Sequence, residues 1–453
     1  MGCEGWRICT IDDLKAPTHG AIAIGPFGSR MKSDCYVPFG VPVIRGTNIS
    51  FTRGFTGEFV FIAPEFADSL GNAIVRAGDL VFPHRGSIGL VGMVPADGNP
   101  RYALSTSLMK LTCNTTKADP AFLLYFFRSP RGRHELLKHA STVGTPGIGQ
   151  PLTSLRSIRL LLPPLPEQKR IAHILGTLDD KIELNRRMNA TLEAMSRAIF
   201  KSWFVDFEPV RQNAAGQQPV GMDAQTATLF PDSFEDSEIG ELPTGWMAGA
   251  LGDCVDVVDC LHTKKPERVE GGGPLLQLAN IRDDGLLDMD DTYFISEEDY
   301  GKWSAKFTTQ VGDCVITNVG RVGAVAQIPP GVSAALGRNM TGLRPKSVFP
   351  YPTFLLECLL SASMRDEIER KTDSGTILNA LNVKNIPRLR LPMPPDSIAA
   401  AFEQKVRSLR ATMERCLTES RTLATLRDTL LPKLLSGEFR VPEAEGMVEE
   451  AVG

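Results

Sequence analysis

Apolar residues recur every three or four positions along one long stretch of the chain, residues 162–204. Three prolines, Pro163, Pro164 and Pro166, stand near its start, and none follows within it. This period predicts one amphipathic helix, because side chains three and four residues apart share a helix face. At about 1.5 Å per residue the helix would be roughly 55–60 Å long, more than one compact domain needs. The apolar stripe therefore predicts a spacer.

The same pattern returns near the C-terminus, as part of a duplication that runs through the whole chain. PVIRGTNI, beginning at Pro42, is echoed by PLLQLANI, beginning at Pro274. RAGDLVFPHRGSIG, beginning at Arg76, is echoed at nearly the same offset by QVGDCVITNVGRVG, beginning at Gln310. Each copy then enters a proline-poor amphipathic segment, the second covering about residues 397–435. We interpret this as one structural unit present twice.

Short apolar runs within each copy alternate with Gly, Pro and Asn turns, which is typical of short strands. Residues 79–82 and 314–316 are such runs, whereas residues 122–127 and 354–360 predict helices that continue to about Lys138 and Lys371. The sequence therefore predicts α+β domains.

Composition and charge narrow the possible functions. The chain has 453 residues, 42% hydrophobic and 23% charged, which predicts two to three globular domains. Residues 205–242 contain eight acidic residues against one basic, which predicts a solvated linker, and the last residues are expected to fray. The first copy, residues 1–160, has 17 Lys and Arg against 11 Asp and Glu, whereas residues 246–391 have 16 against 19. The net charge of −4 thus argues against a uniformly basic nucleic-acid binder but permits local basic faces.

Sequence motifs of catalysis are mostly missing. There is no GxxxxGKS/T loop for a nucleotide. The NPRY run at residues 99–102 differs in its third residue from the adenine-pocket motif of amino-methyltransferases, and no FxGxG-type cofactor loop accompanies it, so a turn is favoured. Gly86 and Gly89 are likewise assigned to tight strand connections rather than to a phosphate site. The histidines show no ligand spacing, and Cys254 and Cys260 are too sparse to define a zinc site, so we expect no active site and no metal.

The sequence also carries expectations about location. The nine cysteines form no CxxC pair, and the MGCEGWRICT start lacks the basic-then-apolar pattern of a secretory signal. The sequence contains no run of eighteen apolar residues, so no membrane span is predicted. We expect reduced thiols and a cytoplasmic protein.

Several motifs together resemble the specificity subunit of type I restriction-modification systems. They are LPPLPEQKRIAHIL from Leu162, KSWFVDFEPV from Lys201 and LRDTLLPKLLSGEFRV from Leu426, within the duplicated layout. The resemblance covers almost the whole chain. It implies an α+β fold in which two tandemly repeated target recognition domains are joined by two long antiparallel coiled-coil helices, in a pseudo-two-fold arrangement. The second copy reads DSIAAAFEQKV, with Glu-Gln-Lys displaced, so the pairing register of the helices is not predicted.

This resemblance divides the chain into six parts. They are recognition domain 1 (1–161), the central long helix (162–204), an acidic linker (205–244), recognition domain 2 (245–391), the distal long helix (392–440) and a disordered tail (441–453).

The family resemblance also implies a function and partners. The chain would be the non-catalytic subunit of a DNA methyltransferase/endonuclease complex, each recognition domain reading half of a bipartite double-stranded DNA target. Two methyltransferase subunits would use S-adenosylmethionine to methylate adenine at N6, and restriction motor-nuclease subunits would join them. The chain itself would bind no cofactor. Half-sites on one face of a duplex lie about 34–36 Å apart per helical turn, so a helix of this length suits a separation of one to two turns.

Candidate base-contacting residues follow from residue chemistry alone, because recognition domains in this family vary greatly. Arg suits guanine and Asn or Gln suits adenine, each good bidentate contact giving about 1–3 kcal/mol of discrimination. The first-domain candidates are Arg45, Asn48, His84, Arg85, Ser87, Arg101, Thr145 and Gln150. Their second-domain counterparts are Gln277, Asn280, Asn318, Arg321, Arg338, Asn339, Thr376 and Asn379. For each residue, a surface polar group or turn former is the alternative.

The two long helices carry a predicted seam and a predicted docking site. The expected seam residues are Ile171, Leu178, Ile182, Leu192, Ile199, Val406, Leu409 and Met413. Pairing within the chain is favoured, since a lone helix this apolar is unstable in water. Asn185 either fixes the register, as buried Asn does in coiled coils, or is exposed. Trp203, Phe204 and Phe207 are candidates for docking the methyltransferase, because interface centres favour aromatics, with local packing as the alternative.

Two other functional classes remain open. One is a coiled-coil scaffold whose duplicated domains bind protein, which the acidic second copy would suit. The other is a self-contained DNA methyltransferase or nuclease, which would need a cofactor loop and an adenine pocket.

Overall fold

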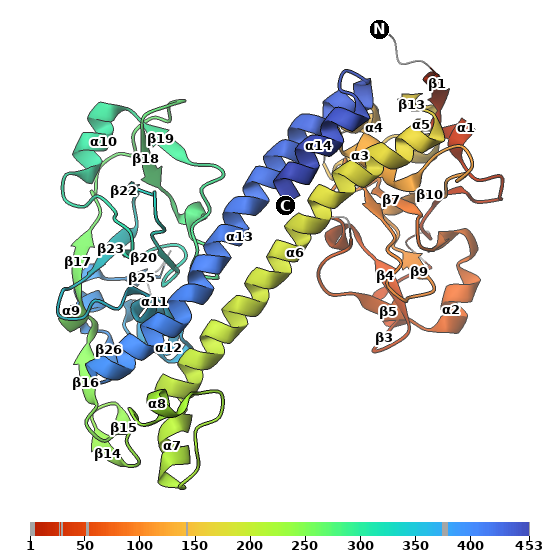
Figure 1. The fold of residues 1–453 in the computed structure, drawn as a ribbon. Helices are drawn as coiled ribbons and strands as arrows, with labels where there is room; N and C mark the ends of the chain where they lie inside the picture. The colour runs from red at the N-terminus through yellow and green to blue at the C-terminus, as the bar shows by residue number, and fades with distance from the viewer. Residues whose placement is uncertain are drawn as a thin grey trace. The chain divides into compact units, whose positions relative to one another are not determined.

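The computed structural model describes residues 5–26, 28, 30–50, 54–141, 144–373 and 379–452. The chain forms two compact units: unit 1 contains Met1–Asn185 with Glu419–Gly453, and unit 2 contains Arg186–Thr418. Two long helices, α6 (Leu165–Phe204) and α13 (Asp396–Ser436), run through both units. Each unit is therefore a globular domain together with one portion of each long helix (Figure 1).

The domain of unit 1 contains two main sheets. The first has the order β2 (Ile22–Ile24), β10 (Leu108–Leu111), β7 (Leu80–Pro83), β8 (Gly92–Met93). The second has the order β3 (Tyr36–Val37), β5 (Val60–Ile62), β4 (Val41–Ile44), β9 (Tyr102–Leu104), β6 (Ile74–Val75). Two further strand pairs are β1 (Arg7–Thr10) with β13 (Arg159–Leu162) and β11 (Ala140–Ser141) with β12 (Gly147–Ile148). Its helices are α1 (Ile11–Leu14), α2 (Pro64–Ser69), α3 (Pro120–Arg128), α4 (Pro130–Leu137) and α5 (Pro151–Ser157).

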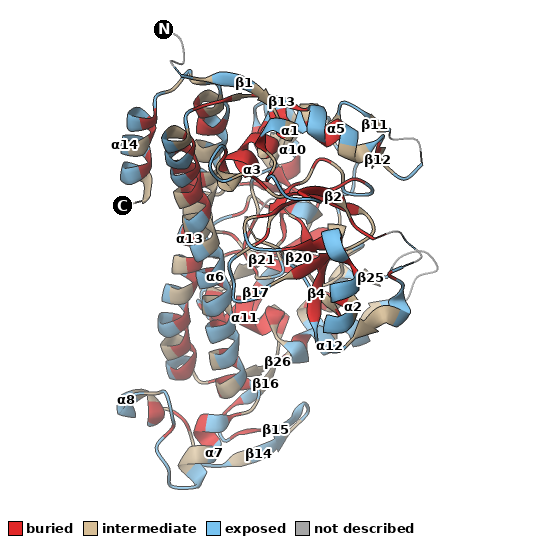
Figure 2. Cartoon of the chain, turned by 90° about the vertical axis from the view of Figure 1, so that its right-hand side faces the viewer, coloured by how far each residue is buried: buried red, intermediate tan, exposed pale blue. Residues whose placement is uncertain are grey.

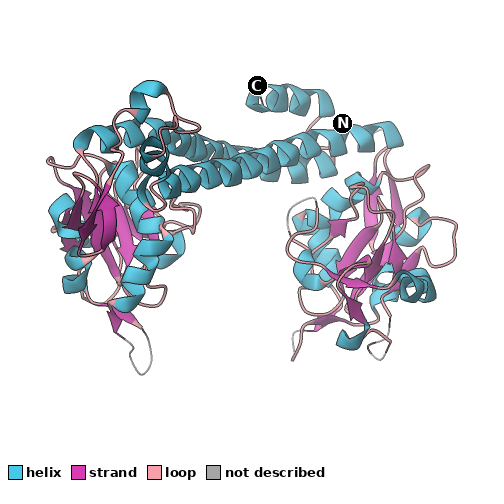
Figure 3. Ribbon diagram, turned by 90° about the horizontal axis from the view of Figure 1, so that it is seen from below, coloured by secondary structure: helices cyan, strands magenta, loops and turns pink. Residues whose placement is uncertain are grey.

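The domain of unit 2 repeats this plan. Its first sheet has the order β17 (Val255–Asp259), β23 (Met340–Pro345), β20 (Cys314–Thr317), β21 (Val325–Gln327), and its second has the order β19 (Tyr293–Ile295), β18 (Gly273–Leu276), β22 (Ala335–Leu336). The pairs β16 (Met247–Ala250) with β26 (Arg390–Met393) and β24 (Thr372–Asp373) with β25 (Ala380–Leu381) match those of unit 1. Helices α9 (Leu251–Cys254), α10 (Glu297–Ser304), α11 (Pro352–Leu360) and α12 (Ala362–Arg370) complete it. The α+β prediction and the duplication are confirmed (Figure 3).

Local sequence explains where the helices of the domains begin and end. The Asp119 carboxylate accepts the Phe122 N–H at 3.0 Å and Pro120 occupies the first turn, so α3 begins here. The expected continuation to Lys138 is interrupted at Ser129, because its hydroxyl caps a separate helix, α4, by accepting the Gly132 N–H. Most of α3 and all of β7 are buried, which agrees with the largely apolar composition of both stretches.

Helices α6 and α13 pair antiparallel, as predicted. In unit 1 the Asn185 amide donates to Glu419 at 2.8 Å, while Asp179, earlier on α6, contacts Arg427, later on α13. In unit 2 Phe200, still later on α6, packs against Phe402, near the start of α13. Asn185 is buried, so of the two alternatives the structure supports a register role.

The predicted seam is found at the buried faces of the helices (Figure 2). Ile171, Leu178, Val406 and Met413 are buried, whereas Ile182, Leu192, Ile199 and Leu409 are partly buried. Among the described residues, no helix has both the length and the apolar content that crossing a membrane requires.

Two segments that the sequence assigned to solvent are packed instead. The acidic segment forms α7 (Glu208–Ala214), α8 (Ala224–Ala227) and the hairpin β14 (Phe234–Ser237) with β15 (Gly240–Pro243), and Val210, Phe230 and Leu242 enter the unit 2 core. The tail forms α14 (Val441–Val452), which buries Val441, Ala444 and Val448 in the unit 1 core. The linker and tail predictions are wrong because a few apolar residues in a polar segment suffice to bind it to an existing core.

Candidate nucleic-acid interface

In unit 1, two loops are joined by hydrogen bonds where β7 ends. The Gly86 N–H donates to the Pro146 carbonyl and the Ile148 N–H donates to the His84 carbonyl, both at 2.9 Å. We call residues 84–88 and 144–150 the β7 tip. Four predicted base-contacting residues are exposed on it: Arg85, Ser87, Thr145 and Gln150. The tip therefore presents a cation, two hydroxyls and an amide on a braced pair of loops.

In unit 2, the equivalent loops meet where β20 ends. The Leu381 N–H donates to the Asn318 carbonyl at 2.9 Å, and the Asn318 N–H donates to the Asn339 carbonyl at 2.8 Å. We call residues 318–321, 338–339 and 379–381 the β20 tip. Its predicted contact residues Arg338 and Asn379 are exposed, and Arg321 and Asn339 are partly exposed. Thr376, also predicted here, lies outside the described residues.

Arg321 is held by contacts that are easily exchanged. Its guanidinium donates to the Ile281 carbonyl and pairs with Asp283. The Asp283 side chain is 96% exposed, and ion pairs at such exposure contribute little to stability. Arg321 can therefore turn from Asp283 to a phosphate or a base edge at small cost.

The residue at the base of each tip supports the loops from inside. His84 is buried and its Nε2 lies 3.2 Å from the Thr106 carbonyl; burial lowers the pKa of His84, so the ring is neutral at neutral pH. Asn318 is also buried, and its side-chain amide oxygen accepts the Thr341 hydroxyl at 3.0 Å. Both were predicted to contact bases. The structure contradicts this, because neither side chain reaches the surface.

Asn48 and Asn280, which end the two matching Asn-Ile motifs, are also structural. Asn48 is 1% exposed, accepts the Arg45 N–H at 3.0 Å and donates to the Thr56 carbonyl at 2.9 Å. Asn280 makes the same two kinds of bond, to the Gln277 N–H and the Asp288 carbonyl. The prediction of base contact is wrong for both, since their polar atoms are used to close a turn.

Three further candidates are engaged with their own domain. Arg45 donates to the Glu58 carbonyl at 3.0 Å, and the Gln277 amide donates to the Leu276 carbonyl at 2.9 Å. Arg101 pairs with Asp68 and directly precedes β9, outside the two loops of the β7 tip. Each of the three therefore has a partner within its own domain, and Gln277 also lies beside Gly337, which precedes Arg338 of the β20 tip.

The glycines of the motifs shape the tips. Gly86 and Gly320 have φ of +79° and +86°, which other residues rarely adopt. This agrees with the prediction of tight strand connections.

Each domain is attached to a long helix through a buried polar cluster, which the sequence did not reveal. In unit 1, Asp179 of α6 accepts the Tyr125 hydroxyl of α3 at 2.8 Å and the Arg427 guanidinium of α13 at 2.7 Å. In unit 2, Arg410 of α13 donates to Glu357 of α11 at 2.7 Å. Tyr125 and Glu357 occupy equivalent positions, because each is the sixth residue of its helix, α3 or α11. The carboxylate of the cluster therefore comes from the long helix in unit 1 (Asp179) and from the globular domain in unit 2 (Glu357).

A second contact of this kind holds the start of α3 and α11. The Gln168 side-chain amide oxygen accepts the Asp119 N–H at 2.8 Å, and the Glu403 carboxylate accepts the Thr353 and Phe354 N–H groups at 2.9 and 3.0 Å. The Glu-Gln-Lys triplet, which occurs in both copies, was the sequence signal that could have predicted this contact. Because the triplet is displaced in the second copy, its Glu (Glu403) makes the contact in unit 2, whereas its Gln (Gln168) makes it in unit 1.

Trp203, Phe204 and Phe207 are not an exposed docking site. All three are buried in the unit 2 core, where Phe204 lies 5.0 Å from Phe402 between ring centroids and Trp203 lies 5.1 Å from Phe230. The docking prediction is therefore wrong and its alternative, local packing, is right. Burial of these rings removes the apolar surface that a partner would need.

Comparison with known proteins gives consistent results. The family model "Type I restriction modification DNA specificity domain" matches residues 32–194. The type I restriction enzyme HindI specificity subunit of Haemophilus influenzae is 27% identical over 75% of this chain and 81% of its own length. The putative type I restriction enzyme MjaX specificity subunit of Methanocaldococcus jannaschii is 23% identical over 89% of this chain and 88% of its own.

Among solved structures, the S subunit of a type I restriction-modification system from M. genitalium shares the fold. The two structures match with a TM-score of 0.58 and 17% sequence identity, and the match covers 95% of this chain and 96% of the other.

Proposed function

We propose that the chain belongs to the family of type I restriction-modification specificity subunits, and that each globular domain reads one half of a bipartite double-stranded DNA target. Subunits of this family supply DNA sequence recognition and are not catalytic. The observation that carries the proposal is the pair of equivalent tips, each with exposed arginine and polar side chains on loops braced at the end of a buried strand. Such side chains can reach base edges in a groove while the sheet holds them in place.

The long helices would set the distance between the half-sites. Each is continuous through both units, and 40 residues of α6 correspond to about 60 Å. The buried polar clusters at Asp179 and Arg410 tie each domain to these helices, so the length of the spacer becomes part of the specificity.

Other subunits would carry out the chemistry. We assign S-adenosylmethionine and adenine N6 methylation to two methyltransferase subunits, and cleavage to restriction motor-nuclease subunits that join them. The chain itself would bind no S-adenosylmethionine or other organic cofactor and would act in the cytoplasm.

The proposal is tested by changing one tip at a time in the complex with the methyltransferase partner. Arg85→Ala should relax sequence preference only in the half-site read by domain 1, and Arg321→Ala only in the other half, each by about 1–3 kcal/mol at the affected base pair. Methylation of a library of randomised targets, followed by sequencing, measures both halves at once. Arg7→Ala, which changes an exposed arginine on β1 outside both tips, is the matched control.

Three outcomes decide between the functional classes. Unchanged preference in both half-sites for both variants would remove the two arginines from the interface. Binding of the complex to DNA that does not weaken with salt would favour a protein-binding scaffold, since phosphate contacts release counterions. Methylation by the purified chain alone with S-adenosylmethionine would favour a self-contained methyltransferase.

A further inference from the structure

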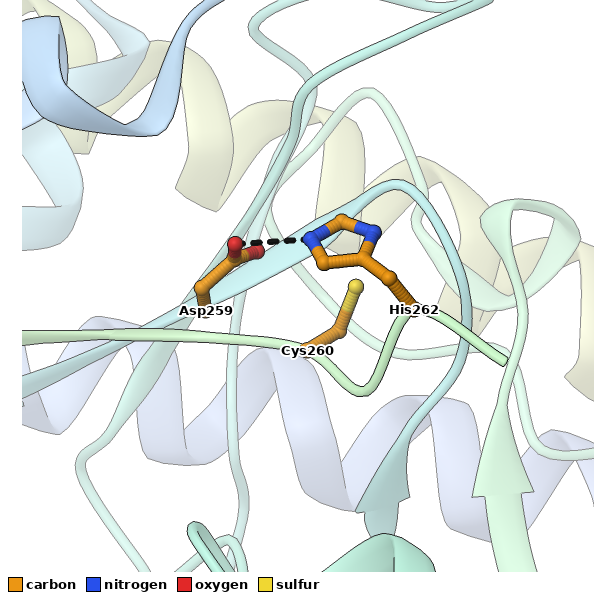
Figure 4. A group of neighbouring side chains, drawn as sticks. All are labelled: Asp259, Cys260 and His262. Atoms are coloured by element: carbon orange, nitrogen blue, oxygen red, sulfur yellow. Dashed lines mark hydrogen bonds and ion pairs between the residues drawn. The ribbon is translucent and has the colours of Figure 1, made fainter.

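Three side chains that commonly bind metals converge where β17 ends. Asp259 is the last residue of this strand, and Cys260 and His262 follow it. One ligand atom from each lies within 4.8 Å of the other two. Figure 4 shows the three side chains on the same side of the segment, with the Asp259 carboxylate facing the imidazole and the Cys260 thiol close to the imidazole ring. Consecutive residues of a regular strand point to opposite faces, so this convergence depends on the strand ending here.

The Asp259 carboxylate has an unused oxygen. Its Oδ2 lies 2.7 Å from His262 Nε2. Its Oδ1 is inaccessible to solvent and has no hydrogen-bond partner among the described residues. An acceptor atom that is buried without a partner is destabilising, and more so when it is charged. A cation at the centre of the cluster would give this oxygen a partner.

The Cys260 thiol is buried beside backbone groups of β23. Its own N–H donates to the Met340 carbonyl at 3.3 Å, which fixes the position of the thiol. Zn²⁺ binds cysteine as the thiolate, so a bound metal would displace the thiol proton.

We propose that Asp259, Cys260 and His262 bind one Zn²⁺, with the fourth position left to water. Zn²⁺ accepts this mixture of thiolate, imidazole and carboxylate ligands in tetrahedral geometry, at about 2.0–2.3 Å. Magnesium and calcium favour oxygen ligands throughout, so a thiol and an imidazole select against them. This proposal differs from the expectation from sequence that there is no metal. Cys254 takes no part, because its sulfur contacts Met393 instead.

The metal would hold the exit of β17 in the recognition domain that carries more acidic than basic residues. The segment that follows, residues 260–272, contains no strand or helix, and Lys264 and Lys265 in it are exposed. Zn²⁺ would fix the first turn of this segment and add positive charge next to its lysines. The site neighbours Asn339 of the β20 tip, so the turn is anchored close to a predicted DNA contact.

The test uses the full-length chain, stripped of metal by a chelator and titrated with Co²⁺ as a spectroscopic probe. One equivalent of Co²⁺ should bind and produce a thiolate-to-cobalt charge-transfer band, and one equivalent of Zn²⁺ should abolish it. Cys260→Ser should remove the band. Cys35→Ser, which changes a partly exposed cysteine of unit 1, should leave it unchanged.

His262→Ala is a second variant, for the case that Cys260→Ser does not fold. It should fold, because the imidazole is largely exposed and contributes little packing. It should lower the affinity for Zn²⁺ by roughly 100-fold or more, since losing even an outer-shell partner costs 10- to 100-fold. No stoichiometric Zn²⁺ or Co²⁺ binding by the wild-type chain would overturn the proposal. A charge-transfer band that persists in Cys260→Ser, or unchanged affinity in His262→Ala, would also overturn it. The assay contains no DNA and no partner, so its result is independent of the proposed function.

Discussion

The buried ion pair between Arg410 and Glu357 predicts a large and pH-dependent effect of one substitution. The two side chains are 3% and 1% exposed, and Arg410 also donates to the Asp284 carbonyl, so it joins α13 to two parts of the second domain. Arg410→Met removes the cation and leaves the Glu357 carboxyl buried. Removing one partner of a buried pair costs about 3–5 kcal/mol, because the desolvated charge that remains has no counter-ion.

The sign of the pH dependence follows from Glu357. Burial raises the pKa of this carboxyl above its ordinary 4.5, and Arg410 acts in the opposite direction. Without Arg410 the folded-state pKa rises further, so the folded variant binds a proton more tightly than the unfolded chain does. Its stability should therefore increase as pH falls from about 7 to 5, and should be lost as pH rises through the folded-state pKa.

Urea unfolding followed by tryptophan fluorescence measures this effect. Trp203, Trp246 and Trp303 belong to unit 2, whereas only Trp6 belongs to unit 1, so the signal reports mainly on the affected unit. A double variant, Arg410→Met with Glu357→Leu, should recover most of the loss, since apolar replacement of a whole buried pair is often neutral.

The control is Lys302→Met, which breaks an exposed pair with Glu298 on α10 and should leave the unfolding midpoint unchanged. A loss below about 1 kcal/mol for Arg410→Met, or a loss that does not diminish on acidification, would refute the reasoning.

Three further variants test other parts of the structure. Burial lowers the pKa of His84 below 6.5, so the unfolded chain binds the proton more tightly and the free energy of unfolding falls as pH drops through 6.5. His84→Asn introduces the residue that stands at the equivalent position 318. This variant should remove that pH dependence in unfolding experiments at several pH values. Phe204→Ala should lower the free energy of unfolding by about 3–5 kcal/mol, because the ring fills a core. While folded, this variant should still copurify with the proposed methyltransferase partner. Asn185→Ala should lower the free energy of unfolding by about 0.5–1.5 kcal/mol, because it removes the hydrogen bond to Glu419. A double-mutant cycle with Glu419→Ala should show that the effects of the two substitutions are coupled.

Local pattern was sufficient to predict the architecture. The period of apolar residues in 162–204 predicted α6 because a helix face repeats every 3.6 residues whatever surrounds it. The repeated motifs predicted two equivalent domains, and the matching strand orders of their sheets confirm them. The exposed tip residues Arg85 and Arg338 were found by the same route, since loops between strands are recognisable from their Gly and polar residues.

The use of individual side chains was decided only by tertiary structure. Asn48 and His84 have the chemistry of base-reading residues, but burial commits them to backbone partners. Trp203 and Phe204 suit an interface equally well as residue types, yet Phe402, about 200 residues further along the chain, covers them. The physical reason is that periodicity and turn chemistry are local properties of the backbone. Whether a polar or aromatic group meets solvent depends on which distant residues pack over it, and for this chain only the folded structure specifies those contacts.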